Sequence, residues 1–172
     1  MTDITSVAEQ AADLGLGDLH HVGFVVADRD KAIDDLERVL GRTTGMRVAG
    51  PSGDTEVRGV RPDYELAAGW VSLGGALLEF LQPLDDRSPH AEFLHEHGGG
   101  LHHLGFRTSA FDEELARLTA AGLSTLIDAT QPGQSMRMVY LEGAPAHGLL
   151  IEIMERSPAA DAFWEHVAPT VS

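Results

Sequence analysis

The sequence predicts an α+β fold made of two tandem βαβββ modules, because two motifs are repeated along it. Leu-His-His-Val-Gly-Phe at 19–24 recurs as Leu-His-His-Leu-Gly-Phe at 101–106, 82 residues further on. Each copy also closes on a related tetrapeptide, Leu-Leu-Glu-Phe at 77–80 and Leu-Ile-Glu-Ile at 150–153. Self-similarity at a long fixed offset indicates a duplicated supersecondary unit. Between its two motifs, each copy has one segment with helical periodicity and further strand-like segments.

The first copy reads as one helix among several strands. Asp28 is a typical N-cap, apolar residues that include Ile33, Val39 and Leu40 form a helical stripe, and Gly41 ends the segment. Segment 50–64 is rich in Gly, Pro and charge, which predicts a long loop without a clear element. In order, we expect strand 19–26, helix 28–40, short strand 46–49, loop 50–64, and strands 70–73 and 76–82 joined at Gly74-Gly75.

The second copy repeats this order after a linker. Ser88-Pro89 begins a short helix that runs to about Glu96, and three glycines end it. The chain then gives strand 101–108, helix 111–121, strands 123–127, 136–141 and 148–155, and a terminal helix 160–167. Residues 2–14 form an amphipathic helix or a frayed terminus. The predicted organisation is an N-terminal extension (1–18), a first module (19–84), a linker helix (85–100), a second module (101–156) and a C-terminal helix (157–172).

Composition excludes several classes of function. The chain has 172 residues, a net charge of −15 and only 12 basic residues, so we expect neither nucleic-acid binding nor attachment to an anionic membrane surface. It has no run of about 18 apolar residues and no basic-then-apolar start, so we expect no membrane span and no secretory signal. Because Cys is absent, a metal site must use His and carboxylates. The absence of Cys also fits a cytoplasmic location.

Strand alternation places four polar residues on one face of the predicted sheet. Val22, Phe24 and Val26 form the apolar face of the first strand, which leaves His21 on the other face. The same argument in the other repeated strands selects the remaining three residues. The face directed away from the helices therefore carries His21, Glu79, His103 and Glu152, with a Gly beside each His strand position to leave room.

If the two modules pair into one curved mixed sheet, these four side chains converge in a cleft. Two imidazoles and two carboxylates suit a divalent ion such as Zn²⁺, Co²⁺, Ni²⁺, Mn²⁺ or Fe²⁺, and the sequence does not choose among them. The alternative is a duplicated scaffold that has kept these residues without the ion. His20 and His102, on the opposite face, are expected to be capped or partly buried polar groups and not ligands.

In these residues the chain resembles the vicinal oxygen chelate superfamily, which includes glyoxalase I, extradiol dioxygenases, fosfomycin-resistance proteins and methylmalonyl-CoA epimerase. The epimerase branch is most similar in its motifs. The resemblance spans 19–155 and implies that His21, Glu79, His103 and Glu152 are metal ligands, and that the protein is a homodimer. Its carrying segments are His-His-Val-Gly at 20–23, Glu-Phe-Leu-Gln-Pro-Leu at 79–84, Arg-Ser-Pro-His-Ala-Glu-Phe-Leu at 87–94, Gly-Leu-His-His-Leu-Gly-Phe-Arg at 100–107 and Leu-Ile-Glu-Ile at 150–153.

Two departures from the epimerase pattern concern the substrate. Epimerases usually have a Lys before the last strand that suits acyl-CoA phosphates, whereas 142–147 reads Glu-Gly-Ala-Pro-Ala-His. The strand before Gly74 carries a catalytic acid in some epimerases, but here it reads Ala-Ala-Gly-Trp at 67–70, and only Glu65 or Asp63 lies near enough to replace it. The substrate is therefore left as a small molecule, either an acyl-CoA or a 2-oxo or hydroxy acid.

The resemblance implies a metal-dependent epimerase or isomerase that acts next to a carbonyl through a metal-stabilised enediolate. Glu152, Glu79 and Glu65 are the candidate bases, since proton removal needs a carboxylate beside the metal. Arg107 shares the cleft face and is expected to bind a substrate carboxylate or to form a salt bridge with a nearby acid. The alternatives are a glyoxalase-like lyase, an Fe(II) dioxygenase, or a small-molecule binding protein without turnover.

Overall fold

The computed structural model describes residues 17–41, 45–73, 76–132, 136–143 and 146–167. The expected helix at 2–14 and the turn at Gly74-Gly75 lie outside the described residues. The described part contains β1 (Asp18–Val25), α2 (Arg29–Leu40), β2 (Gly45–Pro51), β3 (Glu56–Val57), β4 (Glu65–Ser72), β5 (Leu77–Pro83), α3 (Pro89–His97), β6 (Gly100–Thr108), α4 (Phe111–Ala120), β7 (Ser124–Ala129), β8 (Met138–Glu142), β9 (Leu150–Glu155) and α5 (Pro158–Val167). No helix among these residues is long and apolar enough to cross a membrane.

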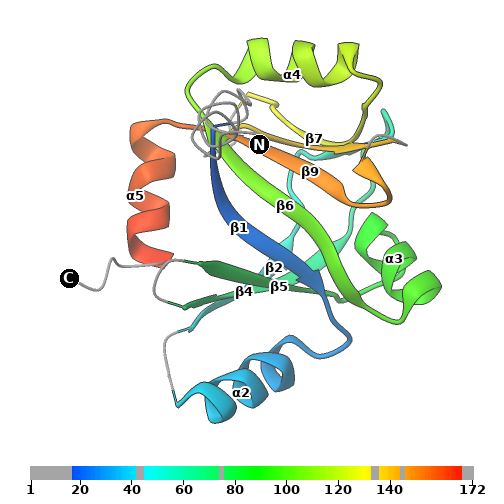
Figure 1. Ribbon diagram of the computed structural model, residues 1–172. Helices are drawn as coiled ribbons and strands as arrows, with labels where there is room; N and C mark the ends of the chain where they lie inside the picture. The colour runs from blue at the N-terminus through cyan, green and yellow to red at the C-terminus, as the bar shows by residue number, and fades with distance from the viewer. Residues whose placement is uncertain (1–16, 42–44, 74–75, 133–135, 144–145, 168–172) are drawn as a thin grey trace, which may run out of the picture.

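All the strands named above belong to one mixed sheet, in the order β2-β4-β5-β1-β6-β9-β8-β7-β3. The two first strands of the repeat, β1 and β6, pair antiparallel at its centre. Each is flanked on its outer side by the closing strand of its own module in parallel, β5 beside β1 and β9 beside β6. Figure 1 shows that the sheet curls along its length. The predicted α+β fold with a curved mixed sheet is therefore confirmed.

The long helices α2 and α4 cover the outer face of the sheet, one on each module (Figure 1). The Asp28 side chain accepts a hydrogen bond from the Lys31 N–H at the start of α2, and Gly41, with φ of 67°, ends it in the left-handed conformation. Ile33 of α2 is fully buried and packs with Val71 and Phe80. The apolar stripe predicted for this helix is shorter than expected, because Val39 is 76% exposed.

Leu40, at the end of that stripe, is likewise 45% exposed.

In the second module, α4 forms the matching outer layer. Phe111 and Leu118 pack with Ile153 of β9 in one buried cluster. The face assignment made from strand alternation holds here, since Ile153 faces the helix and its neighbour Glu152 faces the inner side of the sheet.

The predicted loop at 50–64 is wrong in part. It includes β3, a two-residue strand whose Glu56 and Val57 pair with Asp128 and Ile127 of β7 in the other module. Two residues are too few to show alternation, and their partner is distant in sequence, so the pattern could not reveal them. The strand that follows is also longer than expected, because β4 begins at Glu65 and not at Trp70.

The C-terminal helix α5 packs on its own chain. Trp164 and Val167 are buried with Trp70, Leu77 and Met154 on the inner side of the sheet. Figure 1 shows α5 standing beside β1, on the side of the β1–β6 pair away from α3. The apolar side of α5 that carries Trp164 and Val167 therefore packs within the chain.

Candidate metal centre

Four adjacent central strands each contribute one residue to a polar cluster inside the curled sheet. His21 comes from β1, Glu79 from β5, His103 from β6 and Glu152 from β9. All four are buried, with exposed fractions between 0% and 6%. The structure therefore brings together the four residues that strand alternation had placed on one face.

Two glycines make this convergence possible. Gly23 lies opposite Glu79 and His103 in the neighbouring strands, and Gly105 lies opposite His21 and Glu152. A Cβ at Gly23 would lie 1.8 Å from Cε1 of His103, and a Cβ at Gly105 would lie 2.3 Å from Cε1 of His21. Each imidazole therefore packs directly against the backbone of the neighbouring strand at its glycine. Any side chain at that glycine would occupy the same space as the ring.

The ligand atoms of the cluster face one another. The Nε2 atoms of His21 and His103 are 2.9 Å apart. Oε2 of Glu152 lies 3.0 Å from Nε2 of His21 and 3.7 Å from Nε2 of His103. Oε2 of Glu79 lies 3.4 Å and 3.1 Å from the same two nitrogens.

These spacings fit a divalent ion. With bonds of about 2.1 Å, tetrahedral ligand atoms stand about 3.4 Å apart and adjacent octahedral ones about 3.0 Å apart. The Oε2 atoms of Glu79 and Glu152 are buried and have no hydrogen-bond partner among the described residues, a costly state that a metal ion would relieve. Ligand atoms of His21, His103 and Glu152 all lie within 4.8 Å of one another. Glu79 falls outside this stricter group, yet it contacts both imidazoles, and we include it for that reason.

The charge state of the ion-free cluster follows from its geometry. Burial alone would lower the pKa of His21, but the carboxylates of Glu79 and Glu152 outweigh it and raise the pKa to about 10. Burial alone would raise the pKa of Glu79. The nearby His21 and His103 outweigh burial and hold that pKa below the ordinary value. Without an ion, a proton on His21 thus compensates part of the negative charge.

Two further histidines contact the ligand histidines at their Nδ1 atoms. Nδ1 of His20 lies 3.1 Å from Nδ1 of His21, and Nδ1 of His102 lies 3.1 Å from Nδ1 of His103. In each pair one nitrogen must donate and the other accept, so a ligand that uses Nε2 donates from Nδ1 to its neighbour. Burial lowers the pKa of His20 to about 3 and that of His102 to about 2, which keeps both neutral as acceptors.

From the sequence, His20 and His102 were expected only as capped or partly buried polar groups. No role was expected for His90 of α3. His90 is 2% exposed, and neither ring nitrogen has a partner among the described residues. Its ring lies 5.0 Å from that of His102 and 6.1 Å from that of Tyr140. Burial, with His103 nearby, lowers the pKa of His90 to about 4. A lone helical His gives no signal in periodicity, so only the structure reveals it.

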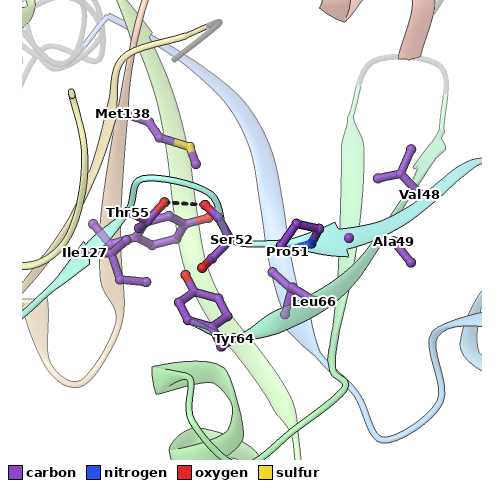
Figure 2. Close-up of a pocket in the computed structure, with 11 residues that line it drawn as sticks. Val48, Ala49, Pro51, Ser52, Thr55, Tyr64, Leu66, Ile127 and Met138 are labelled. Carbon is purple, nitrogen blue, oxygen red and sulfur yellow. Dashed lines mark hydrogen bonds between the residues drawn. The ribbon is translucent and has the colours of Figure 1, made fainter. Parts of the chain in front are cut away.

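Tyr140 of β8 was also missed, and it connects the cluster to a pocket. It pairs with Glu152 across β8 and β9, and its ring lies 5.0 Å from that of His103. Burial, with Glu152 and Glu79 nearby, raises its pKa well above the ordinary value, so its hydroxyl stays neutral beside Glu152. Tyr140 also lines a pocket of about 300 Å³, whose lining residues are drawn in Figure 2.

Two predicted functional residues lie apart from the cluster. Glu65 is exposed at the first position of β4, where its backbone N–H donates to Asp85. Trp70, five residues further along the same strand, is the one that pairs with Glu79. Arg107 forms a salt bridge with Asp161 of α5. Of the two roles expected for Arg107, the structure contains the salt bridge.

Comparisons with known proteins place the chain in a family. Residues 20–140 match the family profile of the glyoxalase/bleomycin resistance protein/dioxygenase superfamily. The uncharacterized protein YqjC of Bacillus subtilis is 32% identical over 150 residues, which covers 86% of this chain and 97% of that one. The mitochondrial methylmalonyl-CoA epimerase of Bos taurus is 27% identical over 140 residues, 80% of this chain and 74% of that one.

A solved structure agrees with these matches. Methylmalonyl-CoA epimerase from Mycobacterium tuberculosis superposes with a TM-score of 0.59 at 29% identity, over 84% of this chain and 91% of that one. The duplicated modules, the curled sheet and the family match lead to one conclusion: this chain belongs to the glyoxalase/bleomycin resistance protein/dioxygenase superfamily, also called the vicinal oxygen chelate superfamily.

Proposed function

We propose that this protein is a metal-dependent epimerase or isomerase that moves a proton on a carbon next to a carbonyl group. The observation that carries the proposal is the convergence of two imidazole nitrogens and two otherwise unpaired carboxylate oxygens at 2.9 to 3.7 Å in a buried cluster. The names of its relatives, which include methylmalonyl-CoA epimerases, support the same reaction class.

In this proposal His21, His103, Glu79 and Glu152 hold the ion. When bound, a divalent metal polarises a substrate carbonyl and lowers the free energy of the enediolate that forms as the neighbouring C–H loses its proton. The surrounding residues keep water away from this chemistry, since every ligand is buried.

The two carboxylates have different surroundings, and this suggests different tasks. Tyr140 pairs with Glu152 across β8 and β9, and Glu152 belongs with His21 and His103 to the tighter group of ligand atoms. Glu79 also contacts the two histidines, but it falls outside that tighter group. We therefore assign the proton transfer to Glu79 and a ligand role to Glu152. Glu65 is not retained as the base, because it is exposed at the far end of β4.

Elemental analysis of the purified protein tests the metal site. We expect about one divalent ion per chain, lost in His21→Ala, His103→Ala and Glu152→Ala. His97→Ala is the matched control, because the His97 side chain is 58% exposed and lies in α3, outside the cluster. An ion-free wild type that takes up no Co²⁺, Zn²⁺, Ni²⁺, Mn²⁺ or Fe²⁺ on reconstitution would contradict the proposal.

Deuterium exchange at the carbon next to a thioester or keto carbonyl tests the chemistry. Glu79→Gln keeps a ligand oxygen but no base, so exchange in D₂O should fall at least about 100-fold while the ion is retained. Glu152→Gln should lower metal affinity more than it lowers exchange by the loaded protein. The opposite ranking would reassign the base to Glu152.

The proposal includes a homodimer in the cytoplasm, as the sequence analysis expected. Phe163 of α5 is 38% exposed and offers apolar surface beside the buried Trp164. Light scattering on the purified protein tests the dimer.

A further inference from the structure

The pocket beside the metal cluster is built from both modules. The first module contributes residues 48–52, Thr55, Tyr64 and Leu66, and the second contributes Ile127, Met138 and Tyr140. In Figure 2, Pro51 and Leu66 lie on the β2–β4 side, and Ile127 and Met138 lie on the β7–β8 side. These strands are far apart in the order of the sheet, so the curl of the sheet creates the pocket.

The pocket adjoins the metal cluster at Tyr140. That residue lines the pocket, pairs with Glu152 across β8 and β9, and contacts the His103 ring. The other side of the cluster is closed by α5, whose Trp164 ring lies 5.8 Å from that of His21 and 6.0 Å from that of Trp70. The pocket therefore lies next to the cluster on the side of Tyr140, away from α5.

The lining of the pocket is apolar with a few hydroxyls. Its apolar surface comes from residues such as Leu66, Ile127 and Met138, and its polar side chains are those of Ser52, Thr55 and the two tyrosines. None of the described residues that line it carries a charged side chain. A volume of about 300 Å³ is at the small end for ligand pockets. It accommodates a short acyl or aryl group, whereas the nucleotide and pantetheine parts of coenzyme A are far larger.

Most basic residues of the chain are already neutralised by carboxylates. Among the described residues, ten Lys and Arg side chains have a carboxylate oxygen within 4.0 Å. Near the pocket, Arg61 pairs with Glu56, and Arg29 pairs with Asp30 while it donates to the carbonyl oxygens of Val48 and Ala68. With a net charge of −15, the chain as a whole disfavours a tail of three phosphates.

We propose that the substrate is a small carbonyl compound with a compact apolar body and no coenzyme A tail, held in this pocket with its carbonyl next to the cluster. This inference rests on the proposed function for the reaction itself. It separates the protein from its relatives named methylmalonyl-CoA epimerase by substrate class and not by fold.

The test compares one acyl group on two carriers. The metal-loaded protein is given methylmalonyl-CoA and methylmalonyl-N-acetylcysteamine, and α-deuterium exchange is followed by NMR. We expect kcat/KM for the short thioester to equal or exceed that for the coenzyme A thioester. A preference of tenfold or more for the coenzyme A thioester would overturn the inference and support the proposed function.

A binding measurement separates the two proposals if neither compound exchanges. Titration calorimetry with free coenzyme A should give no binding up to about 1 mM, and a Kd below about 100 μM would overturn the inference whatever the activity. Absence of exchange with both thioesters, and with short 2-oxo and 2-hydroxy acids, would count against the proposed function and also against this substrate class.

Two substitutions test the pocket. Ala49→Trp and Leu66→Phe add bulk to its wall and should lower kcat/KM for the short substrate at least about tenfold, with metal content unchanged. Val39→Trp is the control, since Val39 is 76% exposed on α2 outside the pocket. Unchanged kcat/KM in both pocket variants would overturn the assignment of this pocket.

Discussion

The close approach of His103 to Gly23 makes a single methyl group a sharp probe of the metal centre. In Gly23→Ala the new Cβ would lie 1.8 Å from Cε1 and 2.3 Å from Nε2 of His103, where ordinary contact begins at 3.4 Å. The ring must therefore recede by about 1.6 Å at Cε1 and about 1.1 Å at Nε2. Metal–nitrogen bonds of about 2.1 Å tolerate roughly 0.2 Å, so the displaced nitrogen leaves bonding distance.

We expect Gly23→Ala to weaken metal binding at least about 100-fold, which corresponds to about 2.8 kcal/mol. Because the ring is also held by His102 and Tyr140, overpacking should lower the free energy of unfolding by about 1–3 kcal/mol. Gly105→Ala should have a smaller effect, since its Cβ would lie 2.3 Å from the His21 ring. Calorimetric titration of the ion-free proteins with Co²⁺ or Zn²⁺ measures the affinities, and urea unfolding measures the stabilities.

Gly50→Ala is the matched control, because Gly50 is also a strand glycine and a Cβ there would meet nothing within 4 Å. It should bind the ion as the wild type does. If Gly23→Ala folds and binds the ion within threefold of the wild type, then His103 does not need its present position, and the metal centre described above is wrong.

Three further predictions concern acid, protons and packing. The pKa of His90 is about 4 in the folded chain, against an ordinary value of 6.5, so the unfolded chain binds the proton more tightly. The free energy of unfolding should therefore fall by about 3 kcal/mol as the pH drops from 6.5 to 4. Urea midpoints should show this pH dependence reduced in His90→Gln and unchanged in the exposed His97→Gln. The pKa of His21 is about 10 without an ion, so metal binding must displace one proton, and metal affinity should rise about tenfold per pH unit from 6 to 9. Metal titrations in buffers of different ionisation enthalpy measure the proton release, and its absence would contradict the prediction. Trp164→Ala should lower the free energy of unfolding by about 3–5 kcal/mol, because Trp164 is 6% exposed, whereas Phe163→Ala at 38% exposure should cost less than about 1 kcal/mol, and equal thermal midpoints would refute the packing described for α5.

The part of the site that the sequence predicts is the part that repeats. His21 and His103 occupy the same position of a duplicated strand, and Glu79 and Glu152 the same position of another, so alternation places all four on one face without knowledge of the sheet order. The helices at 28–40 and 111–121 were predictable for a related reason, since helical periodicity is local in both and Asp28 and Gly41 mark the ends of the first.

What the sequence does not predict depends on contacts between distant segments. β3 exists because it pairs with β7, and Tyr140 matters because β8 lies beside β9. His90 reaches His102 only because α3 folds back over β6. Glu65 was expected near the cluster from sequence distance alone, but a strand of eight residues places its two ends far apart.

Because β1 pairs with β6, each module supplies half of the metal centre and would, alone, have an unpaired strand edge there. A single module would offer one imidazole, one carboxylate and an unpaired central strand, so it would need a second module both to cover that edge and to complete the ligand set. Carrying both modules on one chain raises their effective concentration for each other. A chain cut in the segment between β5 and α3 should therefore yield two fragments that reassociate, and that do so more tightly when a divalent ion is supplied.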